Sequence, residues 1–204
     1  SRPDHRAAEE FLEAVRDESG LLVGWGNNDY GFMHLGFQEY LAAREIWRRY
    51  FEKGDKKYLK FLAGKFGDSW FQEVALLLLA IEDLSIFEPY MNEVVKHRSF
   101  AEHPEVVAMC LEDAAAKNPK PFVRLLEKDP GDDTGLWKRQ MAALPIVKRM
   151  DETALARMIS DLKKHPYEKI RKWILAQAGE QMRETIRAEQ GGYELVRIPA
   201  GTFM

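Results

Sequence analysis

The sequence has a single cysteine, Cys110, in 204 residues. One thiol cannot form a disulfide within the chain, and it cannot supply the thiolate cluster of a structural zinc site. Its neighbours Val107, Ala108 and Leu111 are spaced as on one helix face, so we expect a buried, inert thiol. The histidines are His5, His34, His97, His103 and His165. No two of them have a spacing, such as i and i+4, that would place both on one face of a helix to bind a metal. We therefore expect no metal site.

Neither sign of charge dominates, since 30 basic and 33 acidic residues leave a formal net charge of −3. That balance argues against a broad nucleic-acid interface, in which lysine and arginine neutralise many phosphates. The apolar run from Val74 to Ile81 is far too short to cross a bilayer, and the first residues show no signal-peptide pattern. We expect no nucleic-acid partner, no membrane partner and a cytoplasmic location.

The phosphate-binding pattern Gly-x-x-x-x-Gly-Lys-Ser/Thr is also absent. Gly64-Lys65 comes nearest, but Leu59 stands where the first glycine belongs and Phe66 follows the lysine. Without this loop and a magnesium-binding acid, the chain cannot hydrolyse a nucleotide by the usual route. We expect Lys65 to be a surface lysine, and we expect no catalytic residue and no enzymatic activity in these residues.

What the N-terminal region does contain is the pattern of a β-hairpin between two helices. The apolar runs 20–25 and 30–34 are separated by residues 26–29, Gly-Asn-Asn-Asp, which tolerate positive φ. Apolar periodicity predicts a helix over 4–17 before the hairpin and a one-sided, packed helix over 35–51 after it. The hairpin has few lysines and arginines, which makes it poorly suited to contacts with DNA phosphates.

The rest of the sequence is helical in pattern, and with 46% hydrophobic residues the chain can bury one or two cores. A helix over 70–81, capped by Asp68 or Ser69, is apolar nearly all round and is expected at the centre of its domain. The frequent prolines after Phe87 are explained as helix starts. Two runs, from Pro104 and from Tyr167, resemble second helices of HEAT-like units. The predicted fold is mainly α, with a winged-helix hairpin near the N-terminus followed by a HEAT-like helical array.

The hairpin and the helix after it carry a motif that resembles NACHT-type members of the STAND class of signalling NTPases. The winged-helix domain of that family ends in Phe-x-His-x-x-Phe-Gln-Glu-Tyr/Phe-x-Ala-Ala. The matching residues here are Phe32, His34, Phe37, Gln38, Glu39, Tyr40, Ala42 and Ala43. The runs Phe11-Leu12 and 19–23 also resemble the family's helix and hairpin, and 70–75 resembles the start of the helical region that follows.

The resemblance implies a role for His34, because the corresponding histidine of the family contacts the phosphates of bound ADP and holds the inactive arrangement. An imidazole suits that role, since it can donate a hydrogen bond to an anionic oxygen. The alternative is a histidine that is satisfied locally at the end of a strand. For Gln38 and Glu39 we expect a structural role, in capping or orienting the wing. The resemblance implies ADP or ATP with Mg²⁺ for the parent protein, and no cofactor in these residues.

At the other end, residues 193–204 resemble the first strand of a formylglycine-generating (sulfatase-modifying factor) type domain. We therefore expect an excised piece of a larger bacterial protein. Its parts are residues 1–53 from the end of a winged-helix domain, a helical connector over 54–190 with a candidate division at 129–134, and a linker with the first strand of the next domain over 191–204.

These expectations combine into a function. The helical region would relay ligand binding at a C-terminal sensor domain to a nucleotide-gated NTPase core, both of which would be partners within the parent chain. The alternative is a HEAT-like scaffold that binds a protein partner without nucleotide control. In a third hypothesis, the parent is an enzyme of the formylglycine-generating type.

Overall fold

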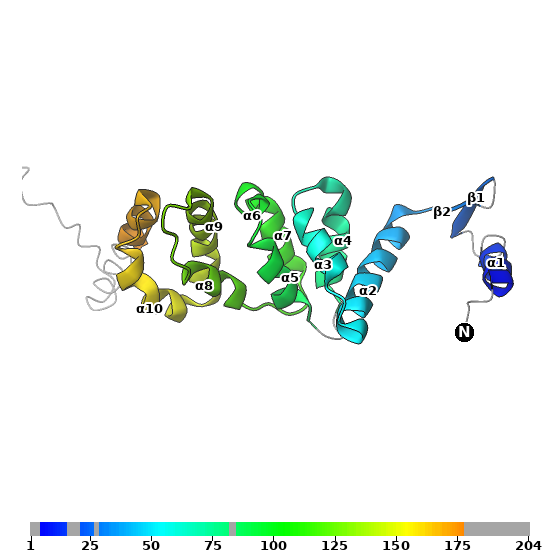
Figure 1. The fold of residues 1–204 in the computed structure, drawn as a ribbon, viewed down its shortest axis with the longest axis horizontal. Helices are drawn as coiled ribbons and strands as arrows, with labels where there is room; N and C mark the ends of the chain where they lie inside the picture. The colour runs from blue at the N-terminus through cyan, green and yellow to red at the C-terminus, as the bar shows by residue number, and fades with distance from the viewer. Residues whose placement is uncertain (1–4, 16–20, 27–28, 82–84, 178–204) are drawn as a thin grey trace, which may run out of the picture. The chain divides into compact units, whose positions relative to one another are not determined.

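The computed structural model describes residues 5–15, 21–26, 29–81 and 85–177. These residues form ten labelled helices and one two-stranded antiparallel sheet, so the protein is mainly α, with a small hairpin near the N-terminus followed by packed helices (Figure 1). They divide into two compact units, with the boundary between Pro121 and Phe122. The C-terminal resemblance at 193–204 and the linker at 191–192 lie outside the described residues.

The hairpin predicted around the Gly-Asn-Asn-Asp turn is present. It follows α1 (His5–Ala14) and consists of β1 (Leu22–Gly26) and β2 (Asp29–Phe32). Leu22 pairs with Phe32 and Gly26 with Asp29, and the register shifts between Gly24 and Gly26. A glycine on each side of this irregularity suits the local bend of a bulge. The hairpin is extended by the Met33 N–H, which donates to the Leu21 carbonyl at 2.9 Å.

The helix after the hairpin, α2 (Leu35–Lys53), ends at Gly54, whose φ of 64° and N–H bond to the Arg49 carbonyl form a left-handed cap. It packs on α4 (Ser69–Leu79) and on α3 (Lys57–Gly64). The predicted cap of α4 is confirmed, because Asp68 accepts from the Trp70 N–H. The prediction that α4 is central is confirmed from Val74 onward, where five of its last six residues are buried.

The first unit is completed by α5 (Phe87–Val94), α6 (Ser99–Glu102) and α7 (Pro104–Asp113). α5 packs on α3, and α7 packs on α4. Pro104 is at the first position of α7, as predicted for a proline that starts a helix. Cys110 is buried, and burial raises the pKa of its thiol to about 12, so the prediction of an inert cysteine is confirmed.

The second unit contains α8 (Lys120–Leu126), which begins just before the unit boundary, α9 (Thr134–Met150), α10 (Glu152–Leu162) and a helical run over 168–177. Asp133 and Asp151 cap α9 and α10 with their carboxylates. The prediction that each proline starts a helix is wrong at Pro145, which is inside α9. Pro145 is exposed, so the carbonyl that loses its partner there can turn toward water.

Candidate functional site

The candidate site is the junction between β2 and α2. His34 is the N-cap residue of α2, with extended backbone (φ −119°, ψ 125°), and its carbonyl accepts from the Phe37 N–H at 3.2 Å. Its side chain makes no capping hydrogen bond and is exposed. The imidazole lies beside the Phe37 ring, with 6.3 Å between ring centroids and 47° between planes. The ring is therefore open to a ligand, and in the described residues no other module covers it.

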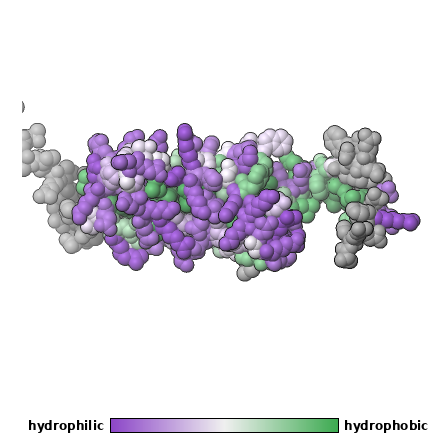
Figure 2. All heavy atoms as spheres, in the orientation of Figure 1, coloured by the Kyte–Doolittle hydropathy of each residue, from purple (hydrophilic) through white to green (hydrophobic). Residues whose placement is uncertain are grey.

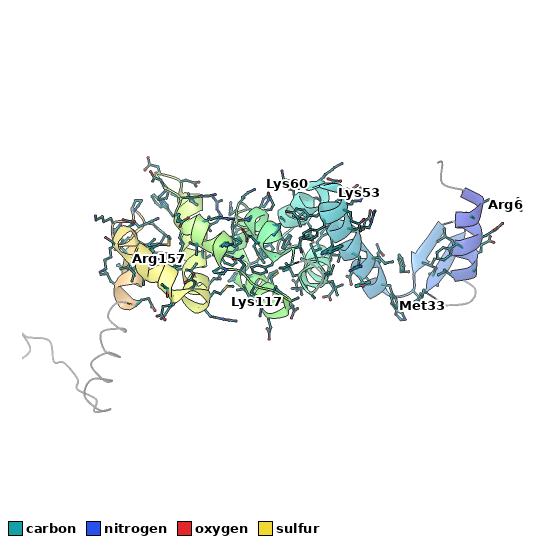
Figure 3. The ribbon with its side chains drawn as sticks, turned by 90° about the horizontal axis from the view of Figure 1, so that it is seen from below. Arg6, Met33, Lys53, Lys60, Lys117 and Arg157 are labelled. Carbon is teal, nitrogen blue, oxygen red and sulfur yellow. The ribbon has the colours of Figure 1, made fainter. Side chains whose placement is uncertain are left out.

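The rest of the motif is less buried than a packed helix predicts. Phe32 is half-buried, while Phe37 and Tyr40 are 44% and 46% exposed. In α2 only Ala43 is fully buried. The prediction of a packed helix is confirmed by the contacts of α2 with α4 and α3, although several side chains of its first turns stay exposed. Green spheres gather where β2 runs into α2 in Figure 2, and Figure 3 labels Met33, 54% exposed, at this junction.

Gln38 and Glu39 line a cavity of about 390 Å³ between α2 and α4. Their expected role in capping or orienting the wing stays a prediction. Trp70, from the first turn of α4, lines the same cavity and is 74% exposed. The resemblance at 70–75 drew attention to this tryptophan, but nothing in the helical pattern indicates that it stays in solvent.

The second half of α2 is fixed by an ion-pair cluster. The Glu45 carboxylate accepts from Arg48 Nε at 2.8 Å and from Arg49 Nε at 2.6 Å. Hydrogen bonds to Arg48 and Arg49 lower the pKa of Glu45 to about 2. The Arg49 guanidinium also lies 4.5 Å from the centre of the Tyr58 ring on α3. The Glu45 pairs are within α2, and the contact of Arg49 with Tyr58 joins this half of the helix to α3.

The described residues bear on the expectations for metal binding and for Lys65. They contain no group of three or more histidine, cysteine, aspartate or glutamate residues placed to hold a metal ion. Lys65, as expected of a surface lysine, is exposed, with its Nζ 3.9 Å from Asp68 and over the Phe71 ring. Of the described helices, none is long and apolar enough to span a membrane. The chemistry available at the junction is therefore hydrogen bonding by an exposed imidazole and apolar contact by its neighbours.

Comparison with known families supports the first resemblance. Residues 2–46 match the family of winged helix-turn-helix domains that lie C-terminal to NACHT, so this segment is part of a NACHT-associated winged-helix region. The match includes the whole motif from Phe32 to Ala43 and ends within α2. None of the curated proteins and none of the solved structures matches the chain. The sulfatase-modifying factor resemblance at 193–204 receives no support from these comparisons.

Proposed function

We propose that this chain is a regulatory segment of a NACHT-type STAND signalling NTPase, in which the wing reports the state of the bound nucleotide to the helices that follow. The observation that carries the proposal is the match of residues 2–46 to the NACHT-associated winged helix. In this role the chain performs no chemistry of its own. It contributes one side of a contact whose other side is the nucleotide-binding core, together with a helical region that leads to a sensor.

The geometry of the junction supports a contact with an anion. The imidazole of His34 is exposed and stands at the N-terminal end of α2, a helix of 19 residues. The first backbone N–H groups of a helix lack intrahelical acceptors and carry partial positive charge, so they favour an anionic oxygen nearby. A phosphate of ADP would thus meet an imidazole N–H and a positive helix end at the same place. ADP would supply the negatively charged phosphate oxygen, and the His34 imidazole would donate a hydrogen bond to it.

The connection from the wing to the helices supports a mechanical role. β2 and α2 are joined by only Met33 and His34, and Met33 is hydrogen-bonded back to Leu21. A movement of the hairpin therefore passes into α2 through two residues. From there it reaches α4 through the packing of α2, and α3 through that packing and the contact of Arg49 with the Tyr58 ring. Such a continuous set of contacts is one route by which two sites can bias the same element.

The test is ADP retention by the full-length natural protein. His34→Ala should release ADP about 10- to 100-fold faster, as expected for the loss of a hydrogen bond to a charged group. His34→Gln, which keeps an N–H donor, should restore part of the retention. Met109→Ala is the control, since it removes an exposed methionine on α7, outside the junction. Release is measured by displacement of a fluorescent ADP analogue, and equal release from His34→Ala and the wild type would overturn the role of His34.

The HEAT-like scaffold stays as a second candidate, because the cavities that α2 lines together with later helices need no nucleotide. It predicts that no substitution at the junction changes nucleotide retention, whereas substitutions in a helical groove change the binding of a protein. The same set of variants therefore separates the two functions.

A further inference from the structure

A groove runs along α2 on the side that faces α3 and α4. It consists of two adjoining cavities of about 390 and 300 Å³, which share Ala42, Phe71 and Val74. One end is lined by Leu35 and Trp70, and the other by Tyr58 and Arg49. From Leu35 to Arg49 the helix rises by roughly 20 Å, at about 1.5 Å per residue. We call this feature the α2 groove.

The walls of the α2 groove carry large aromatic side chains that the fold leaves in solvent. Trp70 is 74% exposed, Phe61 54% and Tyr58 38%, while Leu59, Leu62 and Leu78 nearby are at most 2% exposed. The core of the first unit is thus complete without these rings. Large apolar residues gathered on one exposed surface are uncommon in the absence of a partner, and exposed tryptophan and tyrosine are typical anchors at interfaces.

The charges around the groove differ between its ends. At the Trp70 end stand Glu39 and Asp68, and Glu39 forms no hydrogen bond or ion pair in the described residues. Asp68 accepts from the Trp70 N–H at 3.1 Å and lies 3.9 Å from Lys65. At the other end Glu45 is neutralised by Arg48 and Arg49. Glu39 is therefore the carboxylate beside the exposed indole that has no ion pair in the described residues, and an unpaired carboxylate there attracts a cation to the ring face.

The shape of the site selects a helix as its occupant. The walls are α-helices whose backbone groups, beyond the first turns, are bonded internally, so a docked strand would find few N–H or C=O partners along the groove. A helix satisfies its own backbone and needs only apolar contacts along one stripe. We propose that the α2 groove binds an amphipathic helix of about four turns from a partner protein, with an arginine of that helix on the Trp70 indole between Glu39 and Asp68. The proposal does not depend on a nucleotide role for His34, because His34 does not line the groove.

The probe is a fluorescein-labelled helical peptide of about 16 residues, with leucine at every third or fourth position and arginine at one end. A second peptide has glutamate in place of the arginine. Binding to the 204-residue chain is followed by fluorescence anisotropy. The arginine peptide should bind at least about tenfold more tightly than the glutamate peptide. Failure of the arginine peptide to bind, or equal binding of the two peptides, would overturn the proposal.

Two variants test the residues, with one matched control for each. Trp70→Ala should weaken the binding of the arginine peptide about tenfold or more. Leu175→Ala, which removes an exposed leucine in the second unit, should leave that binding unchanged. Glu39→Lys should reverse the preference between the peptides, while Glu127→Lys should leave it unchanged. Trp70 and Glu127 are exposed and Glu39 is half-buried, and circular dichroism checks that each variant is folded.

Self-association is the competing outcome. If the chain alone dimerises with increasing concentration and Trp70→Ala abolishes the dimer in light scattering, the occupant is a second copy, and the proposal of a separate partner is wrong. A Trp70→Ala variant that binds the arginine peptide as well as the wild type does would also overturn it.

Discussion

Replacing Gln140 by leucine should destabilise the second unit strongly, although the volume of the side chain hardly changes. Gln140 is fully buried on α9. Its Nε2 donates to the carbonyls of Leu125 at 3.1 Å and Lys128 at 2.9 Å, at the end of α8. Its Oε1 lies 2.9 Å from His165 Nε2. Because the amide nitrogen is occupied as a donor, Oε1 is the acceptor, and His165 donates through Nε2.

The size of the destabilisation depends on which of the former hydrogen-bond partners of Gln140 water can reach after the substitution. Lys128 is exposed, so its carbonyl can be rehydrated at little cost. Leu125 is 1% exposed and His165 6%, so the carbonyl of one and the imidazole N–H of the other stay buried without a partner. Each such group costs about 1–3 kcal/mol, which gives roughly 2–4 kcal/mol for Gln140→Leu after allowance for the favourable burial of leucine.

Hydrogen exchange with mass spectrometry is the suitable assay, because two units can unfold separately and a single melting temperature would mix them. Amides of α8 and α9 should lose protection by the predicted amount, while those of α4 in the first unit serve as an internal reference. Lys138→Leu, an exposed change on α9, is the control. Protection in Gln140→Leu within about 0.5 kcal/mol of the wild type would refute the account of the buried amide.

The same contacts make the second unit sensitive to pH. His165 donates through Nε2, and its Nδ1 accepts from the Tyr167 N–H at 3.0 Å, so the neutral ring is fully satisfied. Burial, and then the charge of Arg171, lower the pKa of His165 from its ordinary value of 6.5. The unfolded chain therefore takes up the proton first as the pH falls. The stability that the neutral ring contributes is fully present above about pH 6.5 and is lost as the pH falls below that value. The pH dependence of hydrogen-exchange protection in α8 should therefore be weaker in His165→Gln.

Three further substitutions act in the first unit. Tyr90→Phe should raise the free energy of unfolding by about 1 kcal/mol in exchange or denaturant experiments, because the Tyr90 hydroxyl is buried without a hydrogen-bond partner; a loss of stability would contradict this reading. Gly67→Ala should destabilise by about 2–3 kcal/mol, since φ is +90° and a Cβ would lie 2.2 Å from the His103 ring. Gly54→Ala, at a position with φ +64° and open space around it, should lower the free energy of unfolding by only about 1 kcal/mol. Equal losses of stability in the two glycine variants would exclude the clash with His103.

Features that depend on neighbouring residues in sequence could be predicted. Asp68 caps α4 because its carboxylate reaches an amide two residues on, and Pro104 starts α7 because its ring fixes φ and needs no N–H partner. The hairpin follows equally from the Gly-Asn-Asn-Asp turn between two apolar runs. In each case the signal and the structure it specifies lie within a few residues of each other.

Features that depend on tertiary packing could not be predicted. The buried pair of Gln140 and His165 joins residues 25 positions apart, and nothing local distinguishes His165 from the four other histidines. Apolar periodicity places Tyr40 and Leu41 on helical faces, but it does not say which face another element covers. The positions of Gln38 and Glu39 in a cavity with Trp70 likewise depend on the angle at which α4 crosses α2.

Incomplete burial is the best indicator of function in this protein, and it is concentrated. Eight of the eleven large hydrophobic residues that are exposed in the described part of the chain lie between Met33 and Trp70. Random surface exposure would distribute them over both units, but the second unit has only Leu175 among them. These side chains surround two distinct features, the His34 junction and the α2 groove. Because His34 does not line the groove, His34→Ala and Trp70→Ala should each impair one activity and spare the other.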